Sequence, residues 1–289
     1  MNELRRLRPV AAALLLSFLL TACAGTNRNI FRHHHPVNGT SPALRVATRD
    51  ELNAIIAHTY NSVQSFAATC TLTASSGSVY EGKIVDYTAI PGHVLFRKPD
   101  DIRVQATLPI MGTLVFDMVS NGTEFRFLRN NLFVRGLNSA PANSPNKMEN
   151  LRPEAFLSSM LIRPWDPATE SVMLKDDTDE DDALYRLEFN RKAPDGTPVP
   201  GREVWFDRQD LTIARQKVYD EKGNIISDTS YSKWQVYNGV SFPAHIDINR
   251  RVDGYGVTIE IVKMEMNKEI TDAQFVLQQP EGATVKVIE

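Results

Sequence analysis

The feature that most constrains the fold is a long succession of short segments in which apolar and polar residues alternate, separated by turn signals. Alternation with a period of two is typical of β-strands that bury one face. These segments fill residues 66–136 and 184–267, and pairs such as Asn238-Gly239 and Asp253-Gly254 mark turns between them. About ten or more strands joined mostly by short turns predict a mainly β (α+β) chain with an antiparallel sheet large enough to curl.

The best-defined part of this pattern is Ile102–Phe127, which is expected to form three strands and two turns. Asn121-Gly122 is a strong hairpin signal within it. A strongly curved sheet has a concave face, and the alternation assigns five apolar residues to that face: Leu114, Phe116, Met118, Phe125 and Phe127. They present more apolar area than one layer of strands can bury against itself, so another element or a ligand must fill the face.

Two helices are predicted to cover the concave face. Thr48 and Glu51 form a Thr-x-x-Glu capping box that opens the first helix, whose apolar residues recur on one side. Pro153 begins a shorter helix in which Phe156 and Met160 share a face. Either the helices fill the concave face completely, which gives a solid core, or they roof a pocket that accepts a small apolar ligand.

The first turn inside Ile102–Phe127 is unusual because it carries two large apolar side chains, Ile110 and Met111. Loops of this kind normally lie at the surface, where polar residues are expected. Such a tip either tucks inward or touches something apolar. Two interpretations stay open: a buried turn, or a membrane-facing loop that inserts into lipid or contacts an apolar partner.

The N-terminal residues 1–22 predict an export signal, because a basic start precedes the apolar run Val10–Leu20, which is too short to span a bilayer. The sequence Leu20-Thr21-Ala22-Cys23 resembles the lipobox of bacterial lipoproteins, in which the cysteine becomes the lipidated first residue of the mature protein. Ala24, rather than the Asp of inner-membrane lipoproteins, follows the cysteine. The resemblance therefore implies a lipid anchor on the periplasmic side of an outer membrane.

The remaining residues divide into a tether and a folded part. Residues 23–47 begin with the lipidated cysteine and lack periodicity, so they are predicted to form a flexible tether. The triplet His33-His34-His35 within them has no Cys, Asp or Glu at ligand spacing, and no metal site is predicted. Residues 48–289 are expected to form a single, monomeric domain.

Charge, cysteines and motifs limit the chemistry. A formal net charge of −3 without a long basic stripe gives no electrostatic case for nucleic acid. Cys70 is predicted to be a buried thiol. The acidic run Asp176–Asp182 is predicted to be a solvated hairpin loop rather than a calcium site, because Asp182 stands where a calcium loop needs glycine. Neither Gly-x-Ser-x-Gly nor His-Glu-x-x-His occurs, so no enzyme and no cofactor are predicted.

Three short motifs resemble carriers and receptors of the bacterial lipoprotein-localisation (Lol) pathway: Pro109–Gly112, Tyr237–Pro243 and Asn267–Gly282. In that family the first motif matches a protruding apolar loop that assists delivery to the membrane. The resemblance implies an incomplete antiparallel β-barrel closed by helices, with an apolar cavity that holds acyl chains. The chain is longer than a typical carrier, and the acidic run and residues 137–150 look like insertions.

The resulting hypothesis is a lipid-anchored outer-membrane protein that faces the periplasm, binds acyl chains or lipoproteins, and takes part in lipoprotein or lipid transport. Seven residues are predicted to line its cavity: Leu114, Phe116, Met118, Phe125, Phe127, Phe156 and Met160. The alternative is a non-catalytic envelope interaction or stress-sensing module with a solid core on the same fold. The size of the apolar cavity distinguishes the two hypotheses.

Overall fold

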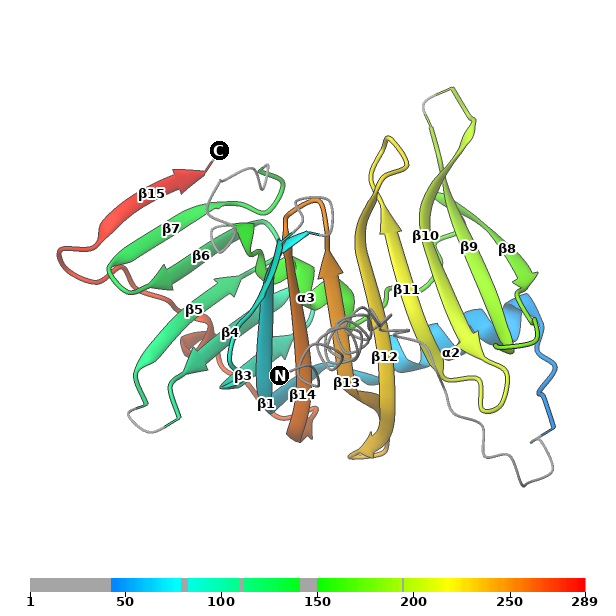
Figure 1. The fold of residues 1–289 in the computed structure, drawn as a ribbon, viewed down its shortest axis with the longest axis horizontal. Helices are drawn as coiled ribbons and strands as arrows, with labels where there is room; N and C mark the ends of the chain where they lie inside the picture. Colours follow the sequence, from blue (N-terminus) through cyan, green and yellow to red (C-terminus); the bar gives the residue numbers. More distant parts are fainter. Residues whose placement is uncertain (1–42, 79–82, 110–111, 141–149, 194, 289) are drawn as a thin grey trace, which may run out of the picture. The chain divides into compact units, whose positions relative to one another are not determined.

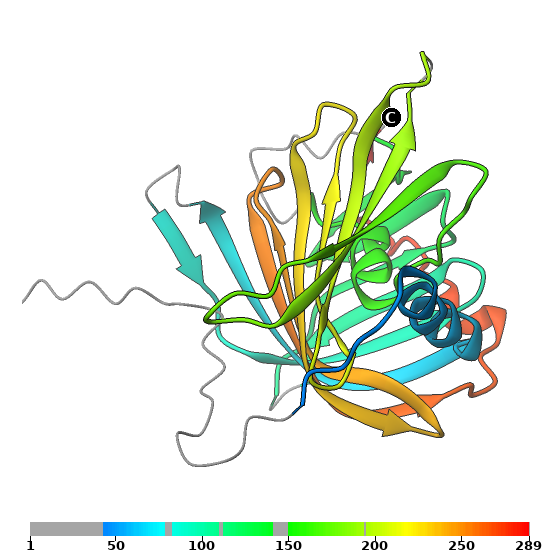
Figure 2. The same cartoon turned by 90° about the vertical axis from the view of Figure 1, so that its right-hand side faces the viewer.

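The alternating segments form strands of one large sheet, and two helices pack on one of its faces (Figures 1 and 2). The structure, a computed structural model, describes residues 43–78, 83–109, 112–140, 150–193 and 195–288. The elements in the first half of the chain are α2 (Arg49–Ser62), β1 (Ser65–Ser78), β2 (Lys83–Asp86), β3 (Ile90–Arg97), β4 (Asp101–Thr107), β5 (Leu114–Ser120), β6 (Glu124–Arg129), β7 (Leu132–Leu137) and α3 (Pro153–Met160). Those in the second half are β8 (Glu170–Asp176), β9 (Leu184–Lys192), β10 (Pro198–Asp207), β11 (Ile213–Tyr219), β12 (Ile225–Tyr237), β13 (Val240–Arg250), β14 (Tyr255–Met266), η3 (Asp272–Phe275) and β15 (Thr284–Ile288).

The sheet formed by the described residues has 15 strands and does not close. Its order is β15-β7-β6-β5-β4-β3-β1-β14-β13-β12-β11-β10-β9-β8, and β2 pairs with β1 beside this path. β1 and β14, far apart in sequence, pair antiparallel and join the two halves. β15 is the exception in direction, since it pairs parallel with β7. The predicted mainly β fold, an incomplete antiparallel barrel with helices on its concave face, is confirmed.

The cross-strand register explains why the predicted alternation produces one apolar face. A single row of directly opposed residues runs across six neighbouring strands, and each member is at most 3% exposed: Ala68, Val94, Val104, Met118, Phe127 and Val134. Because alternate residues of a strand point to opposite faces, this row defines the concave, inner face. Phe116 and Phe125 belong to the same face and are also buried.

Both predicted helices are confirmed, and both lie against the inner face (Figure 2). Thr48 and Glu51 exchange the expected capping bonds: Glu51 Oε2 accepts from the Thr48 amide at 2.7 Å, and Thr48 Oγ1 accepts from the Glu51 amide at 3.3 Å. Buried residues of α2 pack near β13. The eight-residue α3 starts at Pro153 and contacts β4, β5, β12 and β13, so it bridges the two halves of the sheet.

The outer face of the first half is covered by the chain itself. After β14 the C-terminal residues 267–283 return along the outside of β3–β7, where Val119, Phe133 and Leu277 form a second, smaller apolar cluster. Three arginines of the sheet donate to backbone carbonyl oxygens of this C-terminal cover: Arg97 to Ile270 at 3.0 Å, Arg103 to Gln274 at 2.8 Å and Arg126 to Leu277 at 3.2 Å. β5 is therefore buried on both faces.

The folded body begins before the first helix. Arg45, which the sequence places in the tether, donates its backbone N–H to the carbonyl of Arg208 at 2.7 Å. The Arg208 guanidinium returns a bond to the Arg45 carbonyl at 3.4 Å. Ala47 is buried in the main core, and Ala43–Glu289 forms one compact unit.

Several predicted features lie outside the described residues. They are the export signal 1–22, the anchor residue Cys23, most of the tether, and the loop residues Ile110 and Met111. The lipid anchor and the membrane-facing loop therefore stay predictions. None of the helices that the structure describes has the length and apolar character needed to cross a membrane.

Candidate functional site

An apolar cavity of about 110 Å³ lies on the inner face, where the ends of several strands meet α3. Its apolar lining includes residues of β1, β3, β5, α3 and β14: Leu72, Ile90, Phe116, Phe156, Tyr255 and Val257. Pockets for small molecules usually measure about 300–1,000 Å³. The cavity is thus large enough for a segment of an acyl chain, and a whole chain requires an outward shift of neighbouring elements.

A second row of directly opposed residues runs beside the apolar row and ends at Phe116 in the cavity lining. Cys70, Gly92, Ala106 and Phe116 are directly opposed across four strands, and the first three are small. A Cβ atom on Gly92 would lie 2.6 Å from Leu72 Cδ1, so glycine is required for the Leu72 side chain to lie across β3. Leu72 thus lies over Gly92 and lines the cavity together with Phe116.

Burial keeps two titratable groups near this cavity neutral. It raises the pKa of the Tyr255 phenol to about 12 and that of the Cys70 thiol to about 12. Neither group ionises at a physiological pH, and a nucleophilic role for Cys70 would require the thiolate. The described cysteine is free and buried, which confirms the prediction of a buried thiol.

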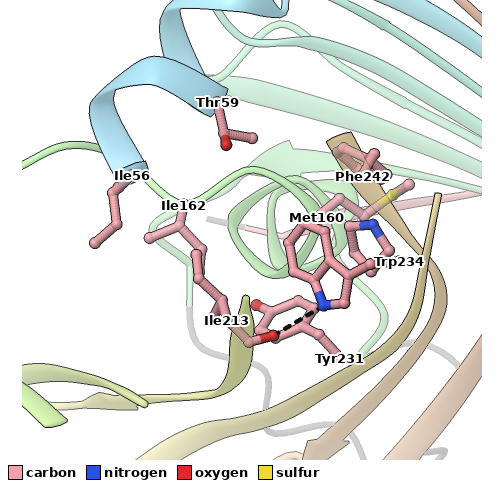
Figure 3. A pocket seen from close by; sticks show the side chains of 9 residues that line it. Ile56, Thr59, Met160, Ile162, Ile213, Tyr231, Trp234 and Phe242 are labelled. Atoms are coloured by element: carbon pink, nitrogen blue, oxygen red, sulfur yellow. Dashed lines mark hydrogen bonds between the residues drawn. The ribbon is translucent and has the colours of Figure 1, made fainter. Parts of the chain in front are cut away.

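A second space on the inner face, between both helices and β11–β13, is almost completely filled (Figure 3). Its volume is about 20 Å³, and Ile56, Met160 and Phe242 are among the residues that line it. Trp234 closes one side and donates its indole N–H to the Ile213 carbonyl at 3.2 Å. A space of this size has room for about one water molecule and none for an acyl chain. The inner face is therefore solid core here.

The seven residues predicted to line a cavity are distributed over different surroundings. Phe116 and Phe156 line the apolar cavity, and Met160 lines the nearly filled space. Three others are at most 2% exposed and line neither of these two spaces: Met118, Phe125 and Phe127. Leu114 is half-buried at the start of β5 and is directly opposed to Thr107 across the register shift, so it lies on the outer alternation and not on the predicted concave face. The structure thus brings Phe116 and Phe156 together and places the other residues in packed core or at its margin.

Other lining residues were not found from the sequence. Val115 lies on the opposite alternation from Phe116 but reaches the cavity, because the β4–β5 register shifts after Ala106. Tyr255 and Val257 lie in β14, which becomes a neighbour only through its pairing with β1. A local pattern carries no signal for a register shift or for a long-range strand pair.

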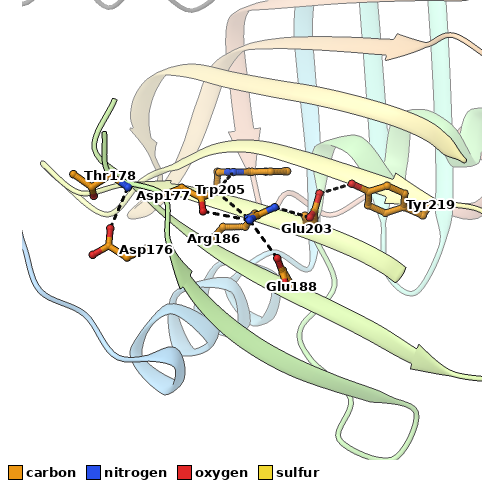
Figure 4. A network of polar contacts seen from close by, with 8 residues as sticks. All are labelled: Asp176, Asp177, Thr178, Arg186, Glu188, Glu203, Trp205 and Tyr219. Atoms are coloured by element: carbon orange, nitrogen blue, oxygen red, sulfur yellow. Dashed lines mark hydrogen bonds and ion pairs between the residues drawn. The ribbon is translucent and has the colours of Figure 1, made fainter. Parts of the chain in front are cut away.

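The acidic run forms the predicted hairpin connection between β8 and β9, and its charges extend onto the outer face of the sheet (Figure 4). Arg186 lies among three carboxylates: Asp177 at 2.9 Å, Glu188 at 3.3 Å and Glu203 at 2.9 Å. Asp177 also accepts the Trp205 indole N–H at 3.1 Å. In the part of the chain that the structure describes, no group of three or more His, Cys, Asp or Glu side chains is placed to hold a metal ion.

This architecture is similar to that of proteins whose structures are known. A family model described as "Uncharacterized protein" matches residues 163–279, and no curated protein matches the chain. A LolA superfamily protein from Nitrosomonas europaea superposes with a TM-score of 0.53 at 11% identity, covering 80% of this chain and 99% of its own. A DUF1329 family protein from Desulfovibrio piger superposes with a TM-score of 0.52 at 13% identity, covering 78% and 96%.

These likenesses define the class of fold. The chain has the LolA-like fold, an unclosed antiparallel sheet with helices on its concave side, as its sequence motifs predicted. At 11% and 13% identity the comparisons establish the architecture, while a ligand has to be argued from the site.

Proposed function

We propose that this protein binds an acyl chain of a lipid or lipoprotein in the apolar cavity beneath α3, at the periplasmic face of an outer membrane. The cavity of about 110 Å³ is the observation that carries the proposal. A void of this size lined by large apolar side chains forfeits packing energy unless something fills it. The LolA-like fold supports the proposal, because the resemblance of the sequence motifs implies an apolar cavity that holds acyl chains.

The lipobox-like sequence supports the location. Lipid attached to Cys23 would keep the chain at the membrane surface, with residues 24–42 between the anchor and the compact unit. Lipid transport or localisation then requires the cavity to exchange its occupant. The short α3 is the element whose outward movement would enlarge the cavity, since Phe156 lies in the lining.

The test is native mass spectrometry of the chain from residue 23 onward carrying Cys23→Ser, exported in a Gram-negative host behind a cleavable signal peptide that replaces residues 1–22, and purified without detergent. We expect it in the soluble periplasmic fraction with a co-purified acyl lipid. Ala74→Phe, which places a ring in the cavity, should abolish the bound lipid. Ala67→Phe makes the same change on the opposite alternation of β1 and should leave the lipid bound.

If the Cys23→Ser chain without a phenylalanine substitution is free of lipid, the acyl-chain proposal is contradicted. That result would favour the solid-core interaction module, which the nearly filled space beside Trp234 supports. Equal lipid content in the two phenylalanine variants would place the ligand elsewhere. Retention of the Cys23→Ser chain in the outer-membrane fraction would contradict the anchor.

A further inference from the structure

One residue in the lining of the apolar cavity carries a charge. Among the described residues that surround this space, Arg129 stands alone in being of the Asp, Glu, Lys, Arg or His type. It is the last residue of β6 and follows Phe125 and Phe127 on the same alternation. It therefore lies on the inner face, at the edge of an otherwise apolar row.

The Arg129 side chain has no hydrogen-bond or ion-pair partner among the described residues, and the residue is half-buried. Other half-buried or buried arginines of the same sheet are paired. Arg103 contacts Asp117 at 2.6 Å on the outer face, and Arg202 contacts Glu170 at 3.0 Å. The difference sets Arg129 apart from the arginines that stabilise the fold.

An arginine without a partner beside an apolar space costs desolvation energy and returns no interaction to the fold. The guanidinium group presents donors in a planar fork that matches a carboxylate or a phosphate. An amphipathic ligand would satisfy both halves of this site. Its tail would contact Phe116 and Phe156, and its anionic head would pair with Arg129 at the edge.

We propose that the cavity selects acyl lipids whose head group is anionic, a carboxylate or a phosphate, and that Arg129 binds that head group. This inference rests on the proposed acyl-chain function and adds the class of head group to it. A buried cation close by, Arg152, lies over the Phe125 ring at 4.5 Å and donates to the Leu151 carbonyl at 3.0 Å, so it is already engaged within the fold.

The test uses the chain from residue 23 onward with Cys23→Ser, loaded with the neutral fluorophore N-phenyl-1-naphthylamine. Palmitate, hexadecyl phosphate and hexadecanol compete for the cavity, and inorganic phosphate serves as a head group without a tail. Arg129→Gln should weaken the binding of palmitate, of hexadecyl phosphate or of both by about 10-fold or more, the usual scale of a charge-assisted hydrogen bond. The affinity for hexadecanol should change by less than twofold, and inorganic phosphate should not displace the fluorophore.

Arg135→Gln is the matched control, because Arg135 lies one strand away on the same alternation as the outer-cluster residue Phe133. It removes the same charge from the other face and should leave the affinities for all competitors unchanged. Arg129→Lys should restore part of the preference for anions.

Two further outcomes separate the proposals. Equal weakening of palmitate, hexadecyl phosphate and hexadecanol by Arg129→Gln, or no weakening at all, would overturn the role of Arg129 while leaving the acyl-chain function intact. Failure of all three long-chain compounds to displace the fluorophore from the chain with an unchanged Arg129 would overturn both. The ratio between palmitate and hexadecyl phosphate in the wild type identifies which head group the site takes.

Discussion

The outer faces of the two halves of the sheet carry the same kinds of side chain in different surroundings. On β3–β6, arginines pair with aspartates and also donate to carbonyl groups of the C-terminal cover. On β9–β12 no described segment returns over the strands in this way, and arginines are held by carboxylates and by the Trp205 ring (Figure 4). On the covered face one ion pair, Arg103–Asp117, is thereby shielded from water.

This difference determines how much each ion pair stabilises the fold. The Arg103–Asp117 pair is 17% and 4% exposed in its side chains, whereas the Arg186–Asp177 pair is 26% and 30% exposed. Water and neighbouring charges can replace a lost partner in the second pair. Removing one partner of a pair shielded from water leaves an uncompensated buried charge.

The largest expected effect comes from Asp117→Ala on the covered face. Asp117 accepts from Arg103 at 2.6 Å and from the Gln105 side chain at 2.9 Å. Its loss should lower the free energy of unfolding by about 3–5 kcal/mol, the range for breaking a buried pair. Urea unfolding followed by circular dichroism measures this change.

Asp177→Ala is the matched change on the open face. Arg186 keeps Glu188 and Glu203 as partners, so the loss should be about 1 kcal/mol or less. Equal losses in the free energy of unfolding of the two variants would show that the C-terminal cover does not change the contribution of an ion pair.

The next effect concerns the apolar contact that holds the C-terminal cover. Leu277→Ala removes one of the three buried members of the outer cluster and should cost near the lower end of the usual range of about 2–5 kcal/mol, because this small cluster can relax. Val236→Ala on β12, where the residue is 71% exposed, should change stability by no more than about 0.5 kcal/mol. Hydrogen exchange should also speed up in β15, which follows the cover. Unchanged exchange there would show that other contacts secure this strand.

The smallest effect is a dependence on pH at the open face. Burial raises the pKa of Tyr219, and its hydrogen bond to Glu203 adds to the shift. Because the folded state holds this proton more tightly, the stabilisation is present below the usual tyrosine pKa of about 10 and is lost as the pH rises through the raised value.

Tyr219→Phe tests this dependence. The variant should lose about 0.5–1.5 kcal/mol at pH 8, the contribution of one hydrogen bond, and its stability should fall less steeply than that of the wild type above pH 10. Urea unfolding at several pH values between 8 and 11 gives the slope of stability against pH for the wild type and for the variant. Parallel slopes would mean that Tyr219 titrates alike in the folded and unfolded chain.

Much of this architecture was predictable because it depends on local patterns. Alternation identified the strands from Ile102 to Phe127, and the same alternation placed Phe116 and Met118 on one face. The capping box at Thr48 and the proline at Pro153 marked the starts of both helices. These signals work because side-chain direction repeats every two residues in a strand and every 3.6 in a helix.

The sequence by itself therefore determined the mainly β class, the inner face and the two helices, since each follows from periodicity within one segment. Tertiary structure alone decided where empty space remains, because the cavity is lined by residues of β1, β5, α3 and β14 that only strand pairing and helix packing bring together. It also decided which arginines are paired: Arg103 meets Gln274 only when the chain returns over the sheet. Arg129 lacks such a partner for the same reason, since contacts between distant segments are fixed by strand pairing and packing, which no local pattern encodes.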